Sequence, residues 1–253
     1  MPFKDDNEAI AYLKKNETLS EDFKEMREYS STLKALVNGD DFIDELINKI
    51  EGIESSLKAK AREKYSRSVK DLFFRLFQPI DNIYYATGGV KDYDIQSDTI
   101  KTNYLKHIAN IRDNKTLSEW VQTYAIQLYN TDPNGVIFLE YKTIPKVDVY
   151  PTYKSSSKIR YYEAKGQLVD YIVFEPKVKN QKTYVRIVDD LIDRTFERNG
   201  NDYILVEELT FPHPFGQVPA VICSNIQLAG EDEKLAPIDS IIEVAKEYAR
   251  DQS

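Results

Sequence analysis

Cysteine and histidine are almost absent from this chain of 253 residues. Cys223 is the only cysteine, which excludes a disulfide within these residues and a zinc cluster held by thiolates. His107 and His213 are the only histidines, so a metal site built from several histidines is excluded too. Long apolar runs are also missing, because no stretch approaches the roughly 18 apolar residues of a membrane span, and the first residues lack a signal-peptide core. We therefore predict a protein made in the cytoplasm, without a membrane segment.

An excess of positive charge is lacking as well. The net charge is −8, from 34 Lys and Arg against 42 Asp and Glu, which disfavours nucleic-acid binding by bulk charge. The charge is uneven, however: residues 1–56 are acidic and residues 57–115 are basic. A basic helix face could contact DNA phosphates, although a solvated face with acidic neighbours is the simpler interpretation. The candidate phosphate contacts are Lys58, Lys60, Arg62, Lys64 and Arg67.

The first half of the sequence has the periodicity of helices. Asp5 or Asp6 can cap a first helix, since their carboxylates accept hydrogen bonds from free backbone N–H groups. The segment "TLSED" at residues 18–22 is typical of a second helix start. Further helices are predicted near residues 42–57, 99–112 and 117–129.

After the turn "NTDPNG" the periodicity changes to the alternation of strands. Pro151 interrupts one candidate strand and so places it at an edge of the sheet. The segments "KIRYYE" and "LVDYIVFE", joined by the turn "AKGQ", are typical of a hairpin. The short turns between the other candidates indicate an antiparallel meander. We predict an α+β fold, with a mainly helical region over residues 1–130 and a β-rich region over residues 131–253 that ends in a helix. The strand candidates are "GVIFLEYK", "VDVYPTYK", "KIRYYE", "LVDYIVFE", "TYVRIVDD", "LIDRTFER" and "DYILVEELT".

The best enzymatic hypothesis rests on acidic residues. Asp189, Asp190 and Asp193 lie close together in the sequence, and converging carboxylates could hold Mg²⁺ for phosphodiester hydrolysis. Acids are also common around turns, and Glu207 and Glu208, being adjacent on a predicted strand, would point to opposite faces. A nucleophilic cysteine lacks a suitable base, and no nucleophile elbow is present. We therefore predict a protein that is not an enzyme and uses no metal or cofactor.

The stretch from residue 205 to residue 225 has a distinctive order of features. It reads as a strand, a proline-rich turn and a short apolar strand, followed by the helical segment "APIDSIIEVAKEYA". Pro212 and Pro214 fix their own φ and remove two backbone donors, and Gly216 supplies the permissive φ of a sharp turn. The local geometry predicts a stiff corner that leads into a buried strand.

This order of features resembles the wing region of tailed-bacteriophage portal proteins, of the type found in phages of Bacteroidetes-like hosts. The resemblance covers roughly residues 70–253, including the upstream segments "DPNGVIFLE", "YPTYKS" and "DYIVFE". In the following helix it rests on Ile238, Ile241, Ile242 and Tyr248. The residues that match the family's turn are His213, Pro214, Phe215, Gly216, Val218 and Pro219.

The resemblance implies a structural subunit of the virion rather than a catalyst. Portal proteins form a homo-oligomeric ring, usually of twelve subunits, through which double-stranded DNA is packaged and ejected. Terminase, scaffold or capsid proteins, and tail-connector proteins bind the ring. Family members are longer, so this chain is expected to be a fragment that lacks the stem, clip and crown. The alternatives are a metal-dependent nuclease and a peptide- or glycan-binding module that uses the tyrosine-rich strands.

Overall fold

The computed structural model divides the chain into two compact units. It confirms the predicted α+β fold, with helices and a large antiparallel sheet. Each unit combines segments from both sides of residue 130. The sheet unit, as we call it, comprises Met1–Glu28 and Pro133–Leu235, and the helical unit comprises Tyr29–Asp132 and Ala236–Ser253. The structure describes residues 3–38, 94–142, 148–165, 168–222, 224 and 235–236.

Two capped helices open the chain, as the sequence predicted. Helix α1 spans Asp6–Lys15, and its N-cap Asp5 accepts a hydrogen bond of 2.9 Å from the backbone N–H of Glu8. Helix α2 spans Glu21–Asn38. The backbone N–H of Phe23 donates to the hydroxyl of Ser20 at 3.4 Å, and Ser20 thereby caps this helix. The predictions for residues 42–57 and for the carboxy-terminal helix lie outside the described residues.

The sheet is antiparallel at every described strand pair. Its order is β2-β1-β10-β4-β6-β7-β8, while β3 pairs with β4, β5 with β6 and β9 with β7. The strands are β1 Val136–Lys142, β2 Asp148–Lys154, β3 Ile159–Lys165, β4 Leu168–Phe174, β5 Lys177–Lys179, β6 Lys182–Val188, β7 Ile192–Asn199, β8 Asp202–Leu205, β9 Phe211–Pro212 and β10 Ala220–Ile222.

The predicted hairpin β3–β4 is confirmed. Strands β6 and β7 also pair as antiparallel neighbours, and β2, which contains Pro151, lies at an edge of the described sheet as expected. Two predictions are wrong. The sheet is not a simple meander, because β10 inserts between β1 and β4. Ala220 pairs with Phe138 of β1 and Val221 pairs with Leu168 of β4, so β10 has a neighbour on each side. The strand predicted over "DYILVEELT" ends at Leu205, and a 3₁₀ turn, Glu207–Leu209, follows it.

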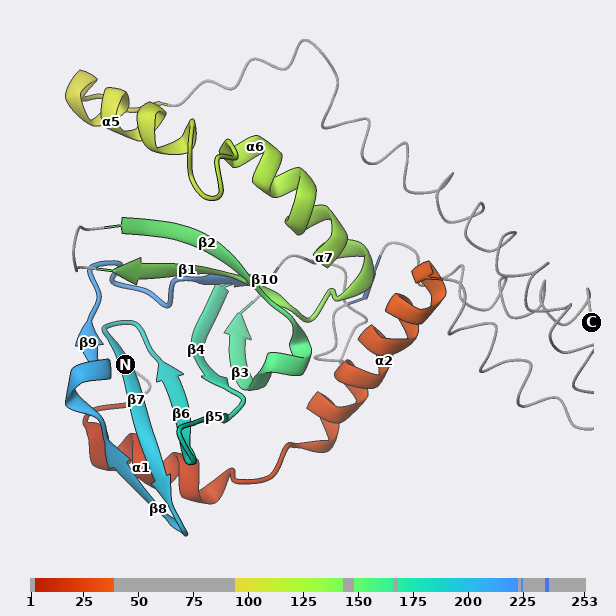
Figure 1. The fold of residues 1–253 in the computed structure, drawn as a ribbon, viewed down its shortest axis with the longest axis vertical. Helices are drawn as coiled ribbons and strands as arrows, with labels where there is room; N and C mark the ends of the chain where they lie inside the picture. The colour runs from red at the N-terminus through yellow and green to blue at the C-terminus, as the bar shows by residue number, and fades with distance from the viewer. Residues whose placement is uncertain are drawn as a thin grey trace, which may run out of the picture. The chain divides into compact units, whose positions relative to one another are not determined.

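The sheet buries side chains on both of its faces. On one face, Val185 and Ile187 of β6 pack with Leu13 of α1, and Figure 1 shows α1 beside β7 and β8. On the other face, a second core forms among β1, β3, β4 and β10, together with Phe23 and Met26 of α2. Because side chains alternate along a strand, Tyr184 and Arg186 of β6 face away from α1.

The sheet is curled, so strands that are not neighbours share contacts (Figure 1). Glu140 of β1 bonds to Arg186 of β6, although β10 and β4 lie between these strands in the order. The concave side of the curl therefore brings together side chains from distant parts of the sequence. The polar residues considered below as a site lie there.

The helical unit contains a helix α5, Asp98–Ile108, and a helix that begins at Leu117. The second helix runs as α6 (Leu117–Trp120), a π-helical turn (Val121–Ala125) and α7 (Ile126–Thr131), where the sequence had predicted one continuous helix. Buried Asp132 follows and accepts hydrogen bonds from Ser30 (2.9 Å) and Lys34 (2.7 Å).

None of the helices in the described part of the chain is both long and apolar enough to cross a bilayer.

Candidate functional site

The structure separates the acidic residues of the nuclease hypothesis. Asp189 accepts hydrogen bonds from the backbone N–H groups of Leu191 (3.0 Å) and Ile192 (2.8 Å), as aspartates at turns do. Its other carboxylate oxygen pairs with Arg194, which also reaches Asp6 of α1 at 2.8 Å. Asp189 is therefore bound within the fold, on the side of the sheet that α1 covers.

Asp193 is bound on the opposite side of the sheet. It accepts hydrogen bonds from the guanidinium of Arg186, at 2.9 Å from Nε and 2.5 Å from Nη2. Asp190 lies beside the turn, while Glu207 and Glu208 are exposed on the 3₁₀ turn rather than on a strand. Within the described ranges, no three His, Cys, Asp or Glu side chains lie together as a metal would require. Asp189 and Asp193 thus bind different arginines on opposite sides of the sheet, and the acids do not converge.

The proline-rich turn of the resemblance is anchored to the sheet. The backbone N–H of His213 donates to the carbonyl of Leu191 at 2.9 Å, and His213 Nε2–H donates to the carbonyl of Asp189 at 2.9 Å. Gly216 has φ of +65°, the left-handed conformation expected of it. The predicted stiff corner is therefore formed, because both hydrogen bonds tie it to the turn after β6.

The far end of the same turn is bound to strand β1. Val218 and Pro219 are buried, and the Pro219 carbonyl accepts a hydrogen bond of 2.7 Å from Leu139. The Phe215 ring lies edge-on to Tyr141 of β1 at 6.0 Å between centroids. The turn thus connects the β6–β7 end of the sheet to β1, with an attachment on each side.

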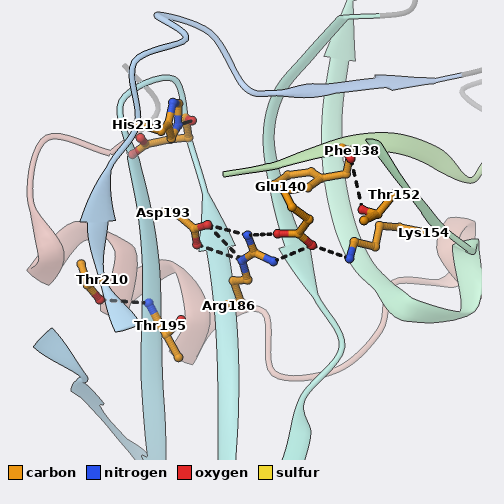
Figure 2. Close-up of polar contacts among 10 residues, drawn as sticks. Phe138, Glu140, Thr152, Lys154, Arg186, Asp193, Thr195, Thr210 and His213 are labelled. Atoms are coloured by element: carbon orange, nitrogen blue, oxygen red, sulfur yellow. Dashed lines mark hydrogen bonds and ion pairs between the residues drawn. The ribbon is translucent and has the colours of Figure 1, made fainter. Parts of the chain in front are cut away.

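An ion network occupies the concave side of the sheet (Figure 2). Arg186 lies between Asp193 of β7 and Glu140 of β1, with 2.9 Å between its Nη2 and Glu140 Oε2. Lys154 of β2 donates to the other oxygen of Glu140 at 2.6 Å. Four strands therefore supply one alternating row of charges, which we call the ion network: Lys154, Glu140, Arg186 and Asp193.

Two phenylalanine rings support the cations of the network. Phe138 and Phe174 meet edge to face, with 5.4 Å between their centroids. The guanidinium carbon of Arg186 lies 5.0 Å and 5.3 Å from the two centroids, and Lys154 Nζ lies 5.8 Å and 5.9 Å from them. Both cations are thus within the range of a cation–π attraction. The network is held by charge and by packing together.

The electrostatics of the network keep its members charged. Burial alone would raise the pKa of Glu140, but hydrogen bonds and the charges of Arg186 and Lys154 lower that pKa to about 2. Burial would likewise lower the pKa of Arg186, yet Asp193 and Glu140 raise it above its usual value. Neither group can exchange protons near neutral pH, so the network is suited to holding strands together rather than to acid–base chemistry.

A cavity of about 740 Å³ opens beside the network. Arg186 and Phe174 form part of its wall, and Tyr184 and Leu209 add apolar surface. Burial lowers the pKa of Lys177, and the nearby charges of Lys154 and Arg186 lower it further. The cavity is rich in cations, which favours an anionic ligand. Its basic lining residues are Lys154, Lys158, Lys177, Lys179 and Arg186.

The candidate phosphate contacts of the sequence lie outside the described residues; these are Lys58, Lys60, Arg62, Lys64 and Arg67. Sequence reasoning missed the ion network and the cavity. One signal was present in the sequence of β6. Arg186 stands between the apolar residues Val185 and Ile187, so a charged side chain is expected on the face opposite to theirs. Its partners could not be found in this way, because Glu140 and Asp193 come from other strands.

The sequence matches no family model, and no curated protein is significantly similar to it.

Proposed function

We propose that this chain is a structural subunit of a tailed-phage portal, the ring at one capsid vertex through which DNA is packaged and ejected. The proposal begins from the resemblance of the turn at residues 213–219 and of the strands before it. It places the protein in the virion, after synthesis in the host cytoplasm. Its partners would be further copies of the chain, double-stranded DNA, terminase, and scaffold, capsid and tail-connector proteins.

The anchored turn is the observation that carries the proposal. His213 attaches it to Asp189 and Leu191, and Pro219 attaches it to Leu139. Two prolines and these hydrogen bonds leave the corner few alternative conformations. A subunit that transmits force between neighbours in a ring needs a joint of this kind, whereas an active-site loop usually needs freedom to move.

The ion network supports a structural role as well. Glu140, Arg186 and Asp193 are committed to one another, and breaking such a buried set is costly. Curled strands that are not neighbours in the sheet are thereby fixed at one spacing. This stiffness serves assembly, in which the shape of each subunit determines how the ring closes.

The copy number of the chain in purified particles tests the proposal. Phage particles released by cells that carry the gene would be purified and digested, and peptides of the chain would be quantified against isotope-labelled standards. The major capsid protein serves as the internal control. We expect about twelve copies in each particle. Absence from purified particles would contradict the proposal, as would a Mg²⁺-dependent nuclease activity that disappears in Asp190→Asn.

A further inference from the structure

Strand β5, Lys177–Lys179, has one neighbour among the described strands. Strands β4 and β5 pair with the same side of β6, at successive positions along it. Strand β5 therefore continues the line of β4 beyond Glu175 and Pro176. The strand β3 covers the outer side of β4 only as far as Phe174, which pairs with Ile159. No described strand covers the outer side of β5. Within the described residues this side is therefore an unpaired sheet edge, and such an edge can accept another strand.

The hairpin geometry shows which backbone groups face outward. Asn180 and Gln181 form a two-residue turn with φ of +51° and +64°, as in a type I′ hairpin. In such a hairpin the flanking residue Lys179 is hydrogen-bonded to β6, and bonding alternates along the strand. The N–H and C=O of Val178 therefore point away from β6. They form the donor and acceptor that an added strand would meet.

Lysines border this edge on the concave side of the sheet. Lys177 and Lys179 are two residues apart and share the face of Tyr184 and Arg186, and Lys158 lines the same cavity. No carboxylate in the described part of the chain lies within ion-pair distance of these three lysines. Among the residues that the structure describes, the positive charge beside β5 is thus not neutralised by a direct ion pair.

The other charges of the cavity are already balanced. Arg186 and Lys154 are paired with Glu140, and Glu175 is paired with Arg27. The three lysines therefore stand out in a chain whose net charge is −8. Charge complementarity favours a ligand with several carboxylates spaced along it. Val178, which is 74% exposed, adds an apolar contact at the edge.

We propose that the β5 edge binds an extended acidic segment of a partner protein, with carboxylates at alternate positions. The segment adds a strand to β5 through the N–H and C=O of Val178. Its carboxylates then lie on the face of Lys177 and Lys179, because strands paired in a sheet share their faces. A single phosphate would satisfy the lysines but would leave the edge unpaired, so the extended segment uses more of the surface.

This binding site goes beyond the proposed portal role and does not depend on it. A partner strand can bind to β5 whether or not the chain forms a ring. Failure of the peptide experiment below would leave the copy-number test of the portal unaffected, and the reverse also holds.

The experiment titrates the full chain into a fluorescein-labelled, terminally capped peptide of sequence EVEVE and follows fluorescence anisotropy. We expect saturable binding that weakens as salt is added. The double variant Lys177→Ala/Lys179→Ala should bind about tenfold more weakly, because the loss of each exposed ion pair lowers the affinity about threefold. The matched control is Lys15→Ala, an exposed lysine of α1 outside the cavity, and it should bind as the unchanged chain does.

Two further measurements test the strand pairing itself. The peptide EEEVV has the same composition and charge without the alternation, and an EVEVE peptide methylated at its backbone nitrogens lacks the donors; both should bind several-fold more weakly. Hydrogen exchange at the amide of Val178 should slow when EVEVE is bound.

Four outcomes would overturn the proposal. The first is no binding of EVEVE by the unchanged chain, and the second is binding that Lys177→Ala/Lys179→Ala leaves unaltered. The third is displacement of EVEVE by inorganic phosphate or by a short DNA duplex at concentrations comparable with the peptide's own, which would show a general anion site. Equal affinity for EVEVE and EEEVV would likewise reject the alternating segment.

Discussion

At the residue scale, Arg186 is the side chain at the centre of the ion network. It joins Glu140 to Asp193, and both carboxylates are largely buried. Replacement by leucine would leave buried Asp193 without its ionic partner and would leave Glu140 with Lys154 alone. We expect Arg186→Leu to lower the free energy of unfolding by about 3–5 kcal/mol. Denaturant unfolding measures this loss.

A matched control for this change exists on the same strand. Lys182 of β6 pairs with Glu197 at 2.8 Å, but it is exposed. We expect Lys182→Ala to leave the free energy of unfolding nearly unchanged. If both variants lost similar stability, charge on β6 in general, rather than the buried network, would be responsible.

The low pKa of Glu140 predicts how the free energy of unfolding changes at acidic pH. A carboxylate whose pKa is lower in the folded chain stabilises the fold above its unfolded pKa, and this contribution is lost as the pH falls toward the folded value. With a folded pKa of about 2, the contribution is complete above about pH 5 and declines between pH 4 and pH 2. It amounts to about 3 kcal/mol.

The comparison of two chains isolates this effect from other titrating groups. Free energies of unfolding would be measured from pH 7 to pH 2 for the unchanged chain and for Glu140→Gln. The difference between the two chains should shrink across the acidic window, because glutamine has no proton to gain. A difference that stays constant over the whole range would contradict the assigned pKa.

At the scale of elements, Gly216 fixes the conformation of the proline-rich turn. Its φ is +65°, and a Cβ placed there would meet no atom within 4 Å. The cost of a side chain is therefore one of backbone strain rather than of collision. We expect Gly216→Val to lower the free energy of unfolding by about 1–2 kcal/mol. Gly216→Asn should cost less, because asparagine tolerates this conformation. Equal costs for the two variants would argue against strain.

The elements that the sequence predicted correctly are those set by neighbouring residues. The Asp5 cap, the β3–β4 hairpin and the edge position of Pro151 all follow from residues within a few positions of one another. The insertion of β10 between β1 and β4 does not, because nothing local distinguishes it from the next strand of a meander. Pairings made across the sheet depend on the whole fold.

The candidate site was beyond sequence reasoning for the same physical reason. The proline turn could be predicted because prolines and a glycine act on their own backbone. The ion network could not, since Glu140, Lys154 and Arg186 meet only when the sheet curls. The acidic residues that looked like a cluster were separated, because Asp189 and Asp193 bind different arginines on opposite faces.

At the scale of the whole molecule, the start of the chain belongs to the sheet unit. Helix α1 lies far from the strands in sequence, yet buried Ala9 and Leu13 share a core with Ile187 and Phe196. A salt bridge of 2.8 Å between Asp6 and Arg194 adds to this contact. The amino-terminal helix is thus a structural part of the sheet unit rather than an appendage.

This placement predicts that a change in α1 loosens distant strands. Leu13 is 1% exposed, so Leu13→Ala leaves a cavity and should cost about 2–5 kcal/mol. Hydrogen exchange should accelerate in β6 and β7, whose side chains line that cavity. Leu105→Ala on α5, where the side chain is 42% exposed, serves as the control and should leave exchange in these strands unchanged. Unaltered exchange in Leu13→Ala would mean that β6 and β7 hold together without the contribution of α1.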